Sequence, residues 1–382
     1  MADSPSTSDS QAPAGRRRPT RYVTETVFFP AAAAYGAVAV PLSVHGMLGG
    51  SWAPPGLSNP SAHAHELLFG YALAVVTGFL VNRLSMRRML LLALLWVAGR
   101  VTFLALPGNS LALAANLGFA LAVAGTAAPR FMKAAKKWRN RVIAPLILAI
   151  CATAAVSQTA IFGGAAILTW LALSEAVLLF ALLMLFFGGR LIAPAAAGAI
   201  EAVGGRLTAR VQPRVEGALL ILMGAALLCN PFPGLRVPTG AILIAAGALA
   251  LVRLLRWRLW ACRARPDLLC LGVGYAWLSL GLILLGLDRT VGIGTVGAGT
   301  THAITVGALG TLTTNVMLRT RLLRLRKPPV AIAGWLIAIT TLLALATIAR
   351  ILAGGEAIVL AMAAGLWCTA LTLCLALLSR HR

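Results

Sequence analysis

Apolar stretches of roughly 20 residues, separated by short segments rich in Arg, Lys, Gly and Pro, recur along almost the whole chain. About 20 apolar residues in an α-helix cross the hydrocarbon core of a bilayer, so each stretch predicts a membrane span. Twelve spans are predicted, at residues 27–48, 60–84, 88–106, 111–129, 142–162, 165–187, 215–229, 237–255, 268–287, 296–318, 330–351 and 357–378. The pattern therefore predicts an all-α fold, a polytopic membrane helix bundle.

The segments outside these stretches indicate how the chain is organised. Residues 1–24 are polar, basic and rich in Pro and Ser, which predicts a disordered cytoplasmic tail. Residues 25–379 are predicted to form a single twelve-helix transmembrane domain. Its longest interior loop, at residues 188–214, separates two sets of six spans at 25–187 and 215–379, a division that is common in transporters.

Composition and charge fix the class of protein and its predicted orientation. The chain is 59% hydrophobic and only 11% charged, which excludes a soluble fold. If the amino terminus is cytoplasmic, 29 of the 33 Lys and Arg residues lie in the tails and in every second loop, and only Arg100, Arg236, Arg289 and Arg350 lie on or near the opposite side. Basic loops stay on the cytoplasmic side, so both termini are predicted to be cytoplasmic.

The net charge of +23 raises the question of a nucleic-acid partner. The segment 253–265 mixes Trp257 and Trp260 with arginines, a pattern that can bind nucleic acid. Beside a membrane span the same pattern favours anchoring at the lipid interface. We therefore predict the lipid bilayer, and no nucleic acid, as the partner of this basic surface.

Four of the five histidines fall at one level, the outer ends of three predicted spans. His45 lies near the end of the first span, His63 and His65 at the start of the second, and His302 at the start of the tenth. Imidazole is a common axial ligand of haem iron and also binds copper. The set could hold either metal, whereas histidines near a water interface can also simply be tolerated there.

Neighbouring residues suggest how these histidines are used. At about 100° per helical residue, His63 and His65 point about 200° apart, so we expect them to serve different partners. Glu66 follows His63 by three residues on the same helix face, so we expect it to orient the His63 ring. Arg100 lies at the depth of Glu66, and either an ion pair with Glu66 or a bound haem propionate would compensate its charge.

Three other polar features lie within or beside the predicted spans. Asn59 and Pro60 have the pattern of a helix cap followed by the first helical residue, so the second span is expected to begin there. Glu175 lies near the middle of the sixth span with no basic residue at its predicted depth, so it is expected to be protonated or hydrogen-bonded, and it is a candidate for a proton path. Arg350, at the outer end of the eleventh span, has the same two interpretations as Arg100.

Five sets of motifs stand out along the chain, at residues 63–72 with 78–80, 95–100, 189–194, 274–282, and 302–311 with 317–320. They resemble the motifs of the NnrS family, in the same order and on the same helices. The resemblance covers roughly residues 28–330. It implies a polytopic bacterial membrane protein that contains haem and copper and is linked to the response to nitric oxide. It also places His63, His65, Glu66, Arg100 and His302 on motif positions of the family, and His45 in a less characteristic region.

Two segments depart from the family pattern. The turn at residues 82–88 is shorter than the family's loop, and residues 322–327 stand where the family has a histidine. A function of that missing histidine is therefore in doubt for this chain, whereas the outer histidines are all present.

Taken together, these observations predict a haem b protein of the bacterial inner membrane that acts in nitric oxide response or tolerance. The haem is predicted near the periplasmic face, with His63, His65 and His302 as candidate ligands and His45 as a further one. Copper is a second candidate cofactor. The expected partners are nitric oxide or another small gaseous ligand, and a membrane or periplasmic redox partner. Whether the protein is an enzyme is left open, with a haem-dependent membrane oxidoreductase and a twelve-helix transporter without haem as alternatives.

Overall fold

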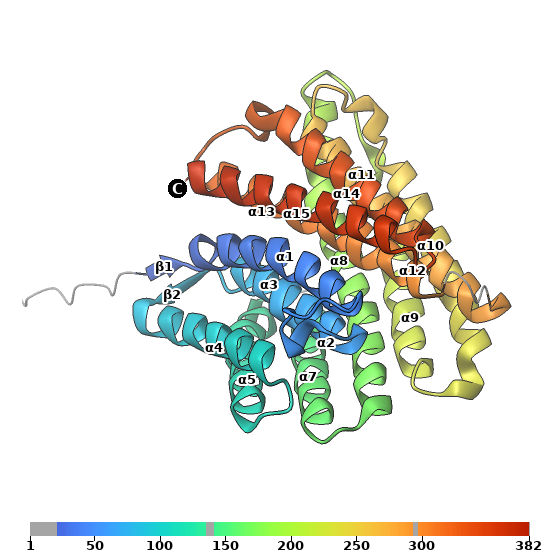
Figure 1. Cartoon of the computed structure of the whole chain (residues 1–382). Coiled ribbons are helices and arrows are strands. Elements are labelled where there is room, and N and C mark those ends of the chain that lie inside the picture. Colours follow the sequence, from blue (N-terminus) through green and yellow to red (C-terminus); the bar gives the residue numbers. More distant parts are fainter. Residues whose placement is uncertain (1–20, 135–140, 293–296, 382) are drawn as a thin grey trace, which may run out of the picture.

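The computed structural model describes residues 21–134, 141–292 and 297–381, which are almost entirely helical (Figure 1). The long helices are α1 (Glu25–Met47), α4 (Met86–Ala105), α5 (Ser110–Ala134), α7 (Ile143–Phe162), α8 (Ala166–Glu201), α9 (Pro213–Cys229), α10 (Arg236–Arg256), α11 (Pro266–Val291), α14 (Ala333–Leu352) and α15 (Ala357–Arg380). Two further helical runs each consist of three segments: α2 (Pro60–His65), η2 (Glu66–Ala72) and α3 (Leu73–Leu80), then α12 (Gly297–His302), η6 (Ala303–Gly310) and α13 (Thr311–Arg324). The short elements are β1 (Arg21–Val23), β2 (Arg83–Ser85) and the 3₁₀ turns η1 (Pro55–Leu57), η3 (Thr208–Arg210), η4 (Pro233–Leu235), η5 (Leu259–Ala261) and η7 (Pro329–Ile332).

The predicted membrane architecture is confirmed. Within the described residues, eleven helices are long and apolar enough to cross a membrane, and they correspond to eleven of the twelve predicted spans. The remaining predicted span is the run from α12 to α13, which is helical but less apolar because threonine and glycine occupy many of its positions. The chain is an all-α, multi-pass membrane helix bundle.

Two predicted boundaries were wrong. The tail was expected to be irregular to residue 24, but Arg21–Val23 form β1 and pair antiparallel with β2, with Arg21 opposite Ser85; residues 1–20 lie outside the described residues. The loop predicted at 188–214 is helical as far as Glu201, because α8 continues through Gly188 and Gly189. The alanine-rich stretch at 195–199 that follows has high helix propensity, which outweighs the expected break at the two glycines.

The first and last spans of the chain lie side by side. Helix α1 packs along α15, which also packs against α14 (Figure 1). The indole Nε1 of Trp367 in α15 donates a hydrogen bond of 2.9 Å to the carbonyl oxygen of Gly36 in α1. The same indole makes an edge contact with the Tyr71 ring of η2, with 5.8 Å between ring centroids. These contacts hold the second span against the first and last spans of the chain.

The second and tenth spans also meet inside the bundle. The hydroxyl groups of Tyr71 in η2 and Thr313 in α13 are hydrogen-bonded at 2.7 Å, although the two residues are 242 positions apart. The second and tenth predicted spans are therefore in direct contact. This contact brings together the two helical runs that carry His63, His65 and His302.

Candidate functional site

The candidate site is built on the ends of α1, α2 and α12 that carry His45, His63, His65 and His302, called the histidine end below. Asn59 caps α2 as predicted, because its side-chain oxygen accepts a 2.9 Å hydrogen bond from the backbone N–H of Ala62. After His65 the α-helix changes to a π-helix, η2, and the same change follows His302 at η6. Short π-helical segments are rare and are frequently found at functional sites, so their position after both histidines marks this region.

Glu66 is the centre of a buried polar network. Its Oε1 accepts hydrogen bonds from a guanidinium nitrogen of Arg100 and, at 3.2 Å, interacts with Nδ1 of His65. Its Oε2 accepts a hydrogen bond from the hydroxyl of Tyr35 in α1. The side chain of Glu66 has no exposed surface. A carboxylate in such a place is expensive unless it is paired, so the network compensates it with one cation and two further donors.

Arg100 is bound on both of its terminal nitrogens. One donates to Glu66, and the other donates to the side-chain oxygen of Asn116 in α5, whose own amide donates 2.9 Å to the carbonyl of Ala112. The predicted ion pair between Glu66 and Arg100 is therefore confirmed. Binding of a haem propionate by Arg100 stays a prediction, and Glu66 and Asn116 already occupy these two nitrogens.

The network determines which nitrogen of His65 carries the proton. An ionised carboxylate only accepts hydrogen bonds, so Nδ1 of His65 is the donor to Glu66. In the neutral ring the other nitrogen, Nε2, then keeps its lone pair, and this atom is buried without a hydrogen-bond partner. The ring is held flat against Phe103, with 4.3 Å between ring centroids and 10° between the planes. His65 is thus a fixed imidazole with an unused basic nitrogen.

His63 is held in the same manner by a different partner. The hydroxyl of Ser43 donates 2.9 Å to the carbonyl of Leu57, so it can only accept from Nδ1 of His63, which lies 2.9 Å away. Nε2 of His63 is again the lone-pair nitrogen. His63 and His65 therefore have different hydrogen-bond partners, and the prediction that they serve different ligands stays a prediction. The prediction that Glu66 orients His63 was wrong, because Glu66 turns toward His65 where the π-helix begins.

The remaining two candidate histidines are His45 and His302. The ring of His45 stacks on Trp52 with 4.1 Å between centroids, and its Nε2 is buried without a hydrogen-bond partner. His302 is partly buried at the end of α12. Among residues 21–134, 141–292 and 297–381, no three His, Cys, Asp or Glu side chains gather closely enough to form a metal site by themselves. The histidines are therefore candidate ligands singly or in pairs, and not as a compact cluster.

The two remaining charged candidates have different environments. Arg350 in α14 is close enough to His63 to interact with it electrostatically, and it has no acidic partner within the described part of the chain. Glu175 accepts a 2.6 Å hydrogen bond from Asn230, and Arg289 interacts with it electrostatically. The expectation of a hydrogen-bonded Glu175 is confirmed, but the expectation that no basic residue lies at its depth was wrong.

Sequence reasoning missed several residues of the network. Tyr35 and Asn116 were not considered, although Asn116 is a lone amide in an apolar span at the depth of Arg100 and Glu66, which was an available signal. Trp96 was also missed, and its Nε1 donates 2.8 Å to the carbonyl of Gly70 in the π-helix. Ser43 carried no signal in the sequence, because its role depends on how α1 and α2 pack.

The fold and the histidine end define a multi-pass, α-helical membrane protein with a buried polar network at one end of its spans. Residues 26–380, nearly the whole chain, match the NnrS protein family, and the chain belongs to that family. No curated protein was found that matches the chain.

Proposed function

We propose that this protein binds haem b through imidazole ligands at the histidine end and acts in the response to nitric oxide in the bacterial inner membrane. The observation that carries the proposal is Nε2 of His65, a buried lone-pair nitrogen without a hydrogen-bond partner on a ring whose Nδ1 is held by Glu66. Metal-ligating histidines commonly donate their other ring nitrogen to a carboxylate, which fixes the tautomer and raises the basicity of the ligand. Membership in the NnrS family supports the same proposal.

The residues of the network would orient the ligating ring of His65 and would not bind the iron themselves. Glu66 holds the Nδ1 proton of His65, while Arg100 and Tyr35 keep the Glu66 carboxylate ionised and in place. His302 is the proposed ligand from the other span, because the second and tenth spans are in contact through Tyr71 and Thr313. His63, with its own fixed tautomer, is the alternative ligand on the second span.

A bound haem would supply, in its ferrous state, an iron that can bind nitric oxide. A haem at the histidine end would lie on the side opposite the basic loops, which the distribution of Lys and Arg predicts to be periplasmic. Copper is left out of this proposal because no three-ligand group is found within the described residues.

The experiment compares histidine variants of the full chain, purified from a haem-producing host. We expect His65→Ala and His302→Ala each to reduce the haem-to-protein ratio by tenfold or more, measured by absorbance. His381→Ala is the matched control. His381 follows the last residue of α15, at the end of that span opposite the histidine end, so this variant should keep the wild-type haem-to-protein ratio.

Haem loading in these variants distinguishes the histidines that ligate the haem from histidines that only lie near it. Full haem loading in both His65→Ala and His302→Ala would contradict it. Loss of haem in His63→Ala but not in His65→Ala would instead assign ligation to His63. Metal analysis of the same samples shows whether copper is bound in a fixed ratio.

A further inference from the structure

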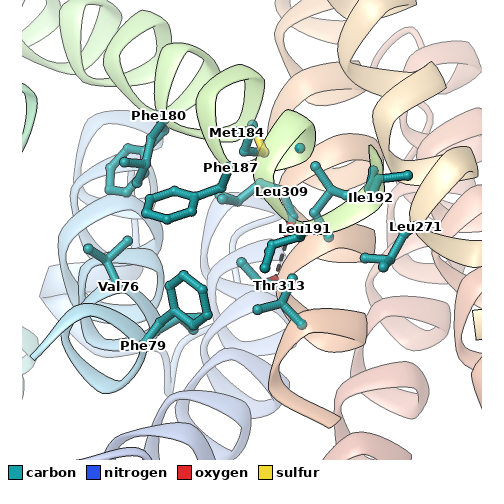
Figure 2. Close-up of a pocket in the computed structure, with 15 residues that line it drawn as sticks. Val76, Phe79, Phe180, Met184, Phe187, Leu191, Ile192, Leu271, Leu309 and Thr313 are labelled. Carbon is teal, nitrogen blue, oxygen red and sulfur yellow. Dashed lines mark hydrogen bonds between the residues drawn. The ribbon is translucent and has the colours of Figure 1, made fainter. Parts of the chain in front are cut away.

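A cavity of about 80 Å³ lies between the spans, away from the histidine end, and is partly open to the outside of the bundle. Its wall is formed by α3, α8, α11 and the run from η6 to α13, with residues such as Val76, Met184, Leu271 and Leu309 facing the space (Figure 2). Val76 is eleven residues beyond His65 on the same span, which is about 16 Å of helical rise. The cavity is therefore separate from the polar network around Glu66.

The wall of the cavity is almost entirely apolar. Among the described residues that line it, Thr313 alone has a side-chain oxygen or nitrogen. That hydroxyl is already used, because it donates 2.6 Å to the carbonyl of Leu309 and is hydrogen-bonded to the Tyr71 hydroxyl. A buried water needs two to four polar partners, and these walls offer no unused one. We conclude that the cavity is dry.

We propose that this cavity binds a small, uncharged, apolar molecule of the size of a diatomic gas or a xenon atom. An engineered cavity of about 150 Å³ lined by Leu, Ile and Phe stays dry and binds benzene or xenon, so a space about half as large with the same lining suits a smaller apolar guest. The surrounding lipid dissolves apolar gases and brings them to the spans.

Two phenylalanines border the cavity on the side of α3 and α8. Phe79 and Phe187 meet edge to face with 5.2 Å between their centroids, and both are only partly buried (Figure 2). Both rings lie on a partly buried side of the wall, so we propose that an apolar guest enters past them. No charged side chain lines this route, which excludes ions and polar solutes from the cavity.

The test uses xenon as the probe and anomalous diffraction from xenon-pressurised crystals of the full chain. We expect an anomalous peak among Val76, Leu309 and Thr313 in the wild type. Val76→Phe fills the space, so the peak should fall to background, whereas Leu309→Ala enlarges the space and should raise the occupancy. Val97→Phe, the same change at a half-exposed position of α4, is the matched control and should keep the wild-type peak.

The outcomes decide the proposal independently of haem, because xenon binding needs no metal. No peak in the wild type and in Leu309→Ala, or an equal peak in Val76→Phe and Val97→Phe, would overturn it. Ordered water or a lipid chain filling the cavity would overturn it as well. Should Val76→Phe not fold, the comparison of the wild type with Leu309→Ala and Val97→Phe still tests the site.

Discussion

At the scale of single residues, one carboxylate determines the arrangement of the histidine end. Glu66 contacts Tyr35 from the first span, His65 from its own span and Arg100 from the third. Each partner is a donor, so the network has a defined direction: protons point toward Glu66, and the lone pair of His65 points away from it. This direction makes the roles of the separate members testable.

Removal of the cation in this network should be costly. Arg100→Leu leaves the buried Glu66 carboxylate without its cation, and we expect a loss of about 3–5 kcal/mol in the free energy of unfolding. The double variant Arg100→Leu with Glu66→Gln should recover part of this loss, because the buried charge is then gone. Thermal or denaturant unfolding in detergent measures both effects.

Arg350→Leu is the control for that measurement. It removes an arginine at a comparable span end but with no acidic partner among the described residues, so the change should stay within about 1 kcal/mol. Equal losses in Arg100→Leu and Arg350→Leu would contradict the buried-pair account.

Replacement of the carboxylate should change the electronic properties of a bound haem. An anionic acceptor on Nδ1 makes His65 a stronger donor to the iron and favours the ferric state, so Glu66→Gln should raise the reduction potential of the haem. A redox titration followed by absorbance measures this shift. An unchanged potential in a haem-loaded Glu66→Gln protein would show that His65 is not the ligand, and the Tyr35→Phe variant, which keeps the carboxylate, should shift it less.

At the scale of elements, the two π-helical segments distinguish the second and tenth spans from the other helices of the described residues. In each, a glycine five residues after the histidine lets a neighbour approach closely. A Cβ on Gly70 would lie 2.7 Å from a guanidinium nitrogen of Arg100 and 2.9 Å from the Tyr35 ring. A Cβ on Gly307 would lie 2.8 Å from the indole of Trp277. The glycines therefore serve packing at both π-helices.

Alanine at these two positions should destabilise the protein. We expect Gly70→Ala and Gly307→Ala each to cost about 1–3 kcal/mol through overpacking, measured by thermal unfolding. Gly125→Ala is the matched control, because a Cβ there meets no atom within 4 Å and alanine is the better helix former. Wild-type stability in all three variants would contradict the close packing.

The elements also show how far the sequence could lead. The spans were predictable because the length of an apolar run is set by the thickness of the bilayer, and the pair of Glu66 and Arg100 was predictable from equal depth. The π-helices were not, because a change of backbone hydrogen bonding after His65 depends on how the span packs against its neighbours. The partnership of His63 with Ser43 was hidden for the same reason, since span order does not say which faces of two helices meet.

At the scale of the whole molecule, the asymmetric distribution of charge predicts how the chain lies in the membrane. A reporter fused after Arg265 should behave as cytoplasmic, and one inserted at residues 107–109, between α4 and α5, as periplasmic. The inverse result for both fusions would reverse the orientation and place the histidine end in the cytoplasm.

The central claim is that the histidine end holds a haem ligated by imidazole, and the optical spectrum of the purified wild-type protein tests it most directly. The account predicts a Soret band that shifts when the oxidised protein is reduced, shifts again when nitric oxide is added to the reduced form, and is lost in His65→Ala. A folded wild-type protein, purified from a haem-producing host, that shows no Soret band in either redox state would contradict the account.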